Sequence, residues 1–321
     1  MQIRKDQVHP DLRSLYGPLS VMAALMKKPW FRKFSRWVGD RALQGKDIEG
    51  LDCDERFIES SDGRWQIRTR IYRPTDVEGP LPAMIYIHGG GYILGSPETA
   101  HAIIQRFVTT RPCVVIAPDY RKAFTEPFPA GFNDCYDTLL WARNNAAELG
   151  IRETGFIVAG HSAGGGLTAA VTLKARDTGD ANLAFQMPIY PMIDDTQPLD
   201  ATRAMKSPVW DTELNKIGWD AYLAGVRARG EEVTAYAAPA RNDDYANFPP
   251  TITFVGTMEP FYPEDVAYVE ALRASGVDVA FKEYPGCFHG FDMMAKGVGD
   301  EAKDFTYDQF ADFYDRYCDI K

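Results

Sequence analysis

Residues 156–164 decide the fold, and they read Phe156-Ile157-Val158-Ala159-Gly160-His161-Ser162-Ala163-Gly164. Four apolar residues typical of a buried strand run directly into the pattern Gly-x-Ser-x-Gly, and a helical stretch follows. A strand-to-helix turn this sharp needs glycines on both sides, and it projects the serine above the sheet edge. We therefore predict that Ser162 is a nucleophile. A glycine-rich turn that binds phosphate is the competing interpretation, but the lysine of such a loop is missing.

Short apolar runs alternate with helical stretches along most of the chain. A β-hairpin is expected from residues 56–60 and 65–73. Buried strands that alternate with helices predict a mostly parallel central sheet with helices on both faces. The expected strands are residues 83–87, 113–117, 156–159, 184–189, 251–255 and 277–284, and the expected helices are residues 102–109, 131–149, 165–177, 213–223, 264–275 and 304–318.

A second glycine motif, His88-Gly89-Gly90-Gly91-Tyr92, ends the strand expected at residues 83–87. Three successive glycines lack Cβ atoms, so their backbone can approach a ligand closely and point N–H groups at it. We predict that the amides of Gly90, Gly91 and Ala163, with Gly89 as an alternative donor, form an oxyanion hole. His88 is expected to brace this loop.

A serine hydroxyl is hardly ionised at neutral pH, so a nucleophilic serine needs a base. His289 is the candidate, because it lies in a loop between the last predicted strand and the last predicted helix. Such a loop reaches the carboxyl end of the sheet, where the serine is expected. His161 is next to the serine, but its backbone geometry should point it away.

The base needs a carboxylate that fixes its tautomer and stabilises the imidazolium. Glu259 follows the strand expected at residues 251–255 and is the first choice. Glu264 and Asp265 are alternatives, although both resemble first-turn residues of the next helix, where acids are favoured. The chain order Ser162, Glu259, His289 is the order expected for an α/β-hydrolase.

Composition excludes several classes of function. The 321 residues are 45% apolar and 25% charged, which is ordinary for a soluble globular protein. A formal net charge of −10 argues against a nucleic-acid partner. No apolar run is long enough for a membrane span, and the start of the chain lacks a secretory signal, so we expect a cytoplasmic protein without stable membrane insertion. The five cysteines and five histidines show no disulfide or metal-ligand spacing, so no metal site is assigned.

The first 50 residues differ from the rest of the chain. Between Leu19 and Leu43 apolar residues recur near helical spacing, together with six basic residues, and Pro29 and Gly39 should divide the segment into two or three short helices. We predict that residues 1–50 form a helical cap over a pocket; an ordinary helix pair packed on the body, or a surface that touches anionic lipid, are the alternatives. Residues 51–321 are expected to form the catalytic domain, in which residues 194–232 are interpreted as an insertion that contributes to the cap.

Several motifs in the right order resemble those of the bacterial hormone-sensitive-lipase-like esterases, and the resemblance covers nearly the whole chain. It implies an α/β-hydrolase fold, hydrolysis of carboxylic esters without a cofactor, and an N-terminal cap that shapes the acyl pocket. It also implies that a homodimer through the last strand and helix is an option. The motifs are the glycine motif at 88–92, the elbow at 160–165, Asp119-Tyr120-Arg121, Pro127-Phe128-Pro129-Ala130, Tyr236-Ala237-Ala238-Pro239 and His289-Gly290-Phe291.

The chain departs from that family at two places. The family usually has Asp-Pro where this chain has Glu259-Pro260, and glutamate can still reach the imidazole if its loop is set slightly back. The family tends to have Leu-Ala-Pro-Glu where this chain has Lys122-Ala123-Phe124-Thr125, which removes a rigid proline turn.

The sequence thus predicts acyl transfer, in which Ser162 attacks the carbonyl of a short- to medium-chain ester. An amidase, formamidase or lactonase with the same triad is one alternative, and a ligand-binding protein on the same fold without catalysis is another. The partner we expect is a small-molecule ester. Pocket residues are proposed among aromatic side chains that could equally belong to the core: Tyr92, Trp219, Phe261, Phe288 and Phe291.

Overall fold

The computed structural model describes residues 1–318, except for the side chain of Asp40; residues 319–321, the end of the predicted catalytic domain, lie outside the described residues. Eight strands form one sheet in the order β1-β2-β4-β3-β5-β6-β7-β8. β2 pairs antiparallel with β1 and with β4, and the other neighbours pair in parallel. The predicted mostly parallel sheet is confirmed. The strands are β1 (Leu51–Glu59), β2 (Gln66–Pro74), β3 (Ala83–Ile87), β4 (Val114–Pro118), β5 (Phe156–His161), β6 (Leu183–Ile189), β7 (Thr251–Gly256) and β8 (Val279–Tyr284).

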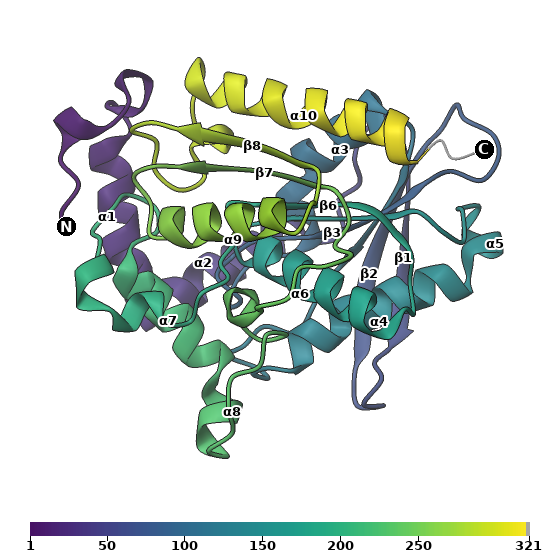
Figure 1. Cartoon of the computed structure of the whole chain (residues 1–321), viewed down its shortest axis with the longest axis horizontal. Helices are drawn as coiled ribbons and strands as arrows, with labels where there is room; N and C mark the ends of the chain where they lie inside the picture. The colour runs from purple at the N-terminus through teal and green to yellow at the C-terminus, as the bar shows by residue number, and fades with distance from the viewer. Residues whose placement is uncertain (319–321) are drawn as a thin grey trace.

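Helices cover both faces of this sheet. Figure 1 shows α3 and α10 on one face and α4, α6 and α9 on the other. The body helices are α3 (His101–Thr110), α4 (Ala130–Asn144), α5 (Ala146–Leu149), α6 (Ala163–Thr178), α9 (Tyr262–Ala274) and α10 (Val298–Tyr317). Single-turn 3-10 helices are η1 (Lys5–Gln7), η2 (Pro10–Leu12), η3 (Pro97–Ala100), η4 (Gln197–Leu199), η5 (Ala201–Arg203), η6 (Pro239–Arg241) and η7 (Phe291–Met293).

The residues of the central strand β3 show why both faces need helices. Ile85 and Ile87 pack in the same apolar cluster as residues of α4 and α6. Met84 and Tyr86 belong to a second cluster with residues of α3 and α10. Successive side chains of a strand point to opposite faces, so a strand that is apolar throughout must be buried on both sides.

Two helix boundaries differ from the sequence expectation by more than two residues. The helix expected at residues 131–149 is two helices, α4 and α5, because Asn145 leaves the helical conformation and its side chain donates to the Trp141 carbonyl, 2.8 Å away. The last helix starts at Val298, six residues before the expected start. Its beginning is fixed by Gly297, whose N–H donates to the Asp300 carboxylate over 3.2 Å.

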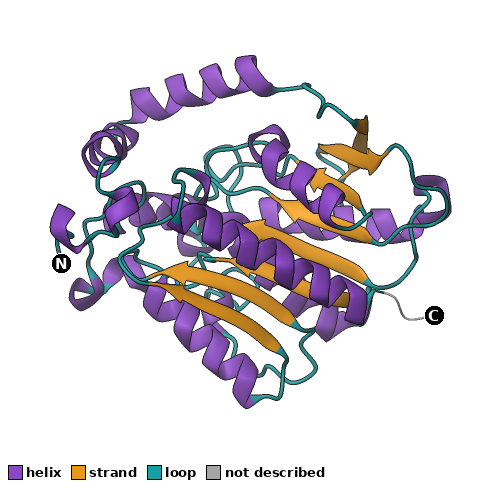
Figure 2. Ribbon diagram, turned by 90° about the horizontal axis from the view of Figure 1, so that it is seen from above, coloured by secondary structure: helices purple, strands orange, loops and turns teal. Residues whose placement is uncertain are grey.

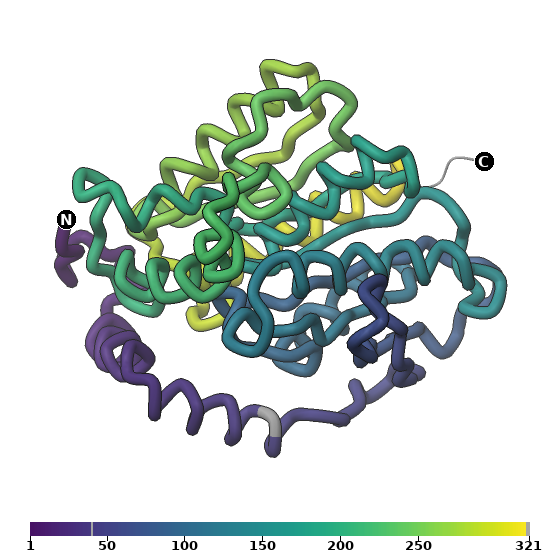
Figure 3. The backbone as a smooth tube through the Cα atoms, turned by 90° about the horizontal axis from the view of Figure 1, so that it is seen from below, coloured from purple at the N-terminus to yellow at the C-terminus, as the bar shows by residue number. Residues whose placement is uncertain are grey.

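The N-terminal helices α1 (Tyr16–Met26) and α2 (Pro29–Leu43) lie outside the helices that cover the sheet, and α2 runs along the side of the molecule (Figures 2 and 3). Pro29 begins α2, a position that suits its fixed φ, whereas the helix continues through Gly39, where an interruption was expected. Residues 194–232 contain α7 (Thr212–Tyr222) and α8 (Ala224–Ala228). Among the described residues, no helix has both the length and the apolar character that crossing a membrane requires.

Candidate active site

Ser162 occupies the turn between β5 and α6. Its backbone has φ 59° and ψ −123°, a conformation that residues other than glycine rarely adopt. The neighbouring glycines are required by space, since a Cβ on Gly160 or on Gly164 would collide with the carbonyl oxygen of Ile87. The strand, the turn and the helix therefore have the arrangement expected from the sequence, with the serine held at the carboxyl edge of the sheet.

The three predicted reactive residues lie in one line of hydrogen bonds. His289 Nε2 is 2.8 Å from Ser162 Oγ, and His289 Nδ1 is 2.5 Å from Glu259 Oε2. The second carboxylate oxygen, Oε1, accepts the backbone N–H of Gly256 over 3.0 Å. All three side chains are buried. Because the Glu259 carboxylate is held at both oxygens, it can fix the orientation of the imidazole.

The two alternative carboxylates are in the first turn of α9 and have other surroundings. Glu264 Oε1 accepts the backbone N–H groups of Ile193 and Asp194, at 2.9 and 3.1 Å. Both carboxylate oxygens of Asp265 are buried without a hydrogen-bond partner among the described residues. This burial raises the pKa of Asp265 well above its ordinary value, because it disfavours the charged carboxylate.

The glycine motif follows β3 and forms a tight turn beside the serine. Gly90 has φ 121° and Gly91 has φ 61°, and the Gly90 carbonyl accepts the N–H groups of Ile93 and Leu94. In the part of the chain that the structure describes, the N–H groups of Gly90 and Gly91 donate to no acceptor. Ala163 is the first residue of α6, where N–H groups have no intrahelical partner. These amides are therefore available to an anionic oxygen.

His88 holds the glycine turn from behind. Its Nδ1–H donates to the Gly89 carbonyl over 2.8 Å, and its ring stacks on Tyr120 with a centroid distance of 4.4 Å. Burial lowers the pKa of His88 to about 3, so the ring is neutral at physiological pH.

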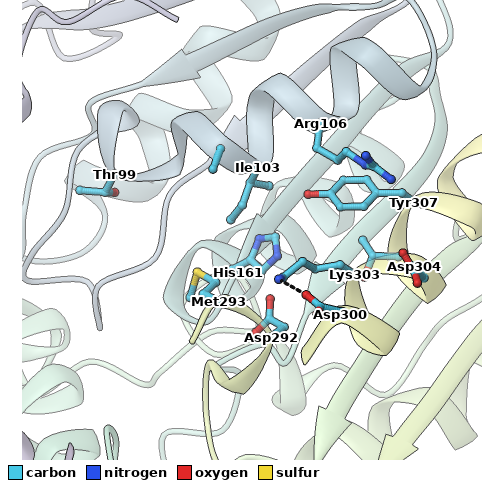
Figure 4. A pocket seen from close by; sticks show the side chains of 12 residues that line it. Thr99, Ile103, Arg106, His161, Asp292, Met293, Asp300, Lys303, Asp304 and Tyr307 are labelled. Carbon is cyan, nitrogen blue, oxygen red and sulfur yellow. Dashed lines mark hydrogen bonds and ion pairs between the residues drawn. The ribbon is translucent and has the colours of Figure 1, made fainter. Parts of the chain in front are cut away.

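His161 points away from the serine, as expected. Its Nδ1 is 2.9 Å from the Tyr86 hydroxyl, and burial lowers its pKa to about 3. The ring borders a cavity of about 620 Å³ that lies between α3 and the start of α10 (Figure 4). Ile103 and Arg106 of α3 project toward this cavity, and Asp292 lies opposite them below His161.

Tyr190 and Asp292 lie close to His289, and the sequence did not predict them as site residues. The Tyr190 ring packs edge-to-face on His289 at 4.9 Å, and its hydroxyl donates to Asp292 Oδ1 over 3.1 Å. Burial raises the pKa of Asp292 to about 6. The one feature of the sequence that could have pointed to Asp292 is its position three residues after His289. Within residues 1–318, no group of three or more His, Cys, Asp or Glu side chains is arranged to hold a metal ion.

The five aromatic side chains predicted to line the pocket are fully buried. Tyr92 stacks on Tyr222 at 4.1 Å and packs edge-to-face on Trp219 at 5.3 Å. Phe288 and Phe291 belong to the apolar cluster between the sheet and α10. These four rings therefore serve as core packing. Phe261 is the exception, since its ring packs edge-to-face on His289 at 5.0 Å.

Trp210 is a further side chain that lies beside the site. Its indole occupies the space that a Cβ on Gly91 would need, and its ring centre is 6.5 Å from that of His289. Trp210 comes from the segment interpreted as an insertion, so this segment approaches the glycine turn and the histidine together.

Known proteins match this chain in sequence and in structure. Residues 84–293 match the family described as the α/β-hydrolase fold. A carboxylesterase of Mycobacterium tuberculosis, NlhH, is 34% identical over 249 residues, which are 76% of this chain and 77% of that protein. An arylesterase of Saccharolobus solfataricus is 33% identical over 229 residues, 71% of this chain and 73% of that protein. The solved structure of a bacterial heroin esterase superposes with a TM-score of 0.84 at 28% identity, covering 96% of this chain and 98% of that one.

Proposed function

Because the chain belongs to the α/β-hydrolase family, as a carboxylic ester hydrolase of its hormone-sensitive-lipase-like branch, we propose that it hydrolyses short- to medium-chain acyl esters through Ser162, His289 and Glu259. The observation that carries this proposal is the 2.8 Å contact between Ser162 Oγ and His289 Nε2, beside backbone amides that have no acceptor within the described residues. A nucleophile, its base and an electrophilic site within reach of both are the elements that acyl transfer requires.

In the proposed reaction, Ser162 Oγ attacks the ester carbonyl while His289 Nε2 takes its proton. Glu259 keeps the proton of Nδ1 in place and offsets the charge of the imidazolium. The oxyanion accepts hydrogen bonds from the N–H groups of Gly90, Gly91 and Ala163, with Gly89 as the alternative donor. Loss of one such donor costs about 3 kcal/mol of transition-state stabilisation. His289 then protonates the leaving alcohol, and a water molecule repeats the sequence to release the acid.

The size of a nearby space supports a small-molecule ester. A space of about 330 Å³ lies between α2 and the residues Ile93 and Leu94, directly after the glycine motif. This volume is at the lower end of the range of roughly 300–1,000 Å³ that is typical of small-molecule sites. We propose that residues 1–50 and 194–232 together cap this region; the cytoplasmic location and a homodimer through β8 and α10 stay predictions.

Replacement of the nucleophile tests the proposal. Ser162→Ala should lower kcat for p-nitrophenyl butyrate by about 10⁵-fold, because the residual rate comes only from binding and the oxyanion hole. A fluorophosphonate probe should label the unmodified protein and leave Ser162→Ala unlabelled. Hydrolysis by Ser162→Ala at more than a few per cent of the original rate would assign the nucleophile elsewhere. A series of p-nitrophenyl esters of increasing acyl length then measures the chain-length preference.

A further inference from the structure

The helix α2 presents an aromatic stripe to solvent. Trp30, Phe34, Trp37 and Val38 follow the spacing i, i+4, i+7, i+8 and therefore share one face of the helix. Their exposed fractions are 63%, 54%, 61% and 41%. The rings of Phe34 and Trp37 stack at a centroid distance of 6.3 Å, so the stripe forms a continuous surface. We call these four residues the aromatic stripe.

The opposite side of α2 faces the protein, and this side is polar. Arg32 donates to the Met26 carbonyl over 2.8 Å and lies 5.5 Å above the Phe124 ring. Arg32 and Arg36 line the space between α2 and the body, and the exposed Lys33 borders this space from the edge between the polar side and the side of Trp30. A surface helix of a globular protein normally turns its apolar face inward, so α2 has the reverse orientation.

The charge of this region also differs from that of the rest of the molecule. Residues 29–43, which form α2, contain four basic residues and a single acidic one, whereas the chain as a whole carries a formal charge of −10. Arg41 follows Trp37 by four residues and so lies on the same face as the aromatic stripe. Lys33 and Arg41 are both exposed. Aromatic and basic side chains are thus offered to solvent by one helix.

We propose that α2 is a docking surface for an anionic phospholipid bilayer, on which the helix lies in the plane of the interface. A helix with Trp and Phe on one face and Lys and Arg around it inserts its rings at the headgroup level and attracts anionic lipids. The basic residues distinguish this occupant from an uncharged apolar partner. Each Lys or Arg near an anionic surface strengthens binding about fivefold.

The other two ways to cover the aromatic stripe fit the charges and contacts less well. If the stripes of two copies met face to face, the positive charges of Lys33 and Arg41 would be brought against their counterparts. If α2 rotated to bury the stripe against its own body, the contacts of Arg32 with Met26 and Phe124 would be lost. Both arrangements remain outcomes that the test below detects.

Vesicle flotation tests the proposal with the full chain. We expect the protein to float with vesicles that contain phosphatidylglycerol and to stay behind with phosphatidylcholine vesicles. Added salt should reduce the bound fraction, because it screens exposed charges. Trp30→Ser combined with Trp37→Ser should reduce the partition coefficient at least tenfold. The matched control is Phe57→Ser with Trp65→Ser, which removes rings that are 61% and 43% exposed on the β1–β2 hairpin and should bind like the unmodified protein.

A second pair of variants tests the charge requirement. Lys33→Glu with Arg41→Glu should abolish binding to the anionic vesicles, whereas Lys5→Glu with Lys296→Glu, the same charge change at two exposed sites elsewhere, should leave most of it. Circular dichroism confirms the fold of each variant. Equal loss in both charge variants, or no binding to anionic vesicles at low salt, would overturn the proposal. Analytical ultracentrifugation could instead show a dimer that becomes a monomer when Trp30→Ser and Trp37→Ser are combined; the aromatic stripe would then bind a second copy of the chain. If the unmodified protein does not bind vesicles and the same double variant has a lower Tm, the aromatic stripe would instead pack against the body of its own chain.

Discussion

At the scale of single residues, Glu259 shows how the longer acid reaches the His289 ring. Its carboxylate has two partners, the His289 ring and the backbone N–H of Gly256, three residues before it. The extra methylene is used to fold the side chain back toward the end of β7, and both oxygens remain hydrogen-bonded. A buried carboxylate with such partners is fixed in orientation, which is what the base needs.

Glu259→Ala should therefore lower kcat for p-nitrophenyl butyrate by about 10³- to 10⁴-fold, because the imidazole loses its orienting partner and the compensation of its charge. The matched control is Asp265→Asn, at a nearby buried acid whose pKa burial raises and whose carboxylate oxygens have no hydrogen-bond partner among the described residues. Asp265→Asn should keep kcat within about twofold. Steady-state kinetics at pH 7 to 8 distinguish the two, and a larger loss in Asp265→Asn would reassign the carboxylate.

Asp292 should give the stability of the protein a specific pH dependence. Burial raises its pKa from 3.8 to about 6, so the folded state holds a proton that the unfolded state has released. Stability that is present below pH 4 is then lost as the pH rises through 6, by about 3 kcal/mol. Asp292→Asn keeps an oxygen for the Tyr190 hydroxyl and removes the titration.

Urea unfolding at pH 4 and at pH 7 measures this effect. The free energy of unfolding of Asp292→Asn minus that of the unmodified protein should be larger at pH 7 than at pH 4. Asp300→Asn is the control on the same cavity: Lys303 lowers the pKa of Asp300, so its removal should give a small change of opposite sign. Parallel pH curves for Asp292→Asn and the unmodified protein would contradict the prediction.

Some of these residues could be predicted from the sequence and others could not. Ser162 and the glycines of the 88–92 motif are recognised because local backbone geometry demands their residue types. Tyr190 and Asp292 have roles that arise only from contacts across the fold, and their residue types carry no local signal. Four of the five aromatic residues predicted to line the pocket pack in the core instead, because a large apolar ring suits a core as well as a pocket wall.

At the scale of elements, the turn between β3 and α3 depends on Gly90. A Cβ there would collide with the Leu94 carbonyl, and φ of 121° disfavours any other residue. Gly90→Ala should therefore shift the turn and its free amides and lower kcat by about 10²- to 10³-fold, as loss of an oxyanion donor does.

Gly79→Ala is the matched control for this prediction. Gly79 also has positive φ, at 92°, but no atom lies within 4 Å of a Cβ there. This variant should lose some stability through backbone strain and keep its kcat, whereas Gly90→Ala should lose kcat. Similar losses of kcat in both variants would mean that the effect comes from destabilisation and not from the oxyanion turn.

The elements themselves were predictable where hydrophobic pattern alone defines them. β3 covers the expected residues 83–87, because a five-residue apolar run between turn signals is too short for a typical buried helix. The start of α10 was missed because residues 298–303 are mostly polar and small, and the signal lies in the Gly297–Asp300 contact. Caps of this kind depend on backbone geometry that composition does not reveal.

At the scale of the whole molecule, two segments far apart in the chain are joined beside the site. Gln2 and Lys206 form a short parallel bridge, in which the Ile3 N–H donates to the Lys206 carbonyl over 3.0 Å and the Lys206 N–H donates to the Met1 carbonyl over 2.8 Å. Lys27, at the end of α1, forms ion pairs with Asp211 and Glu213 at 2.6 and 2.8 Å. The sequence predicted two cap segments but not this link, because pairing across about 180 residues leaves no local pattern.

Lys27→Met tests whether this link shapes the acyl pocket. The methionine keeps the apolar stem of the side chain, while the nearly buried Asp211 carboxylate, which also caps α7, loses its cation. A buried charge that loses its partner destabilises its surroundings, so the two segments should separate more readily. We expect kcat/KM for p-nitrophenyl octanoate to fall about tenfold, equivalent to about 1.4 kcal/mol, while the value for the acetate changes little. The matched control is Lys216→Met, which removes an exposed ion pair with Asp220 on α7 and should change kcat/KM for neither ester. If Lys27→Met lowered kcat/KM equally for both esters, its effect would be on the fold and not on the pocket.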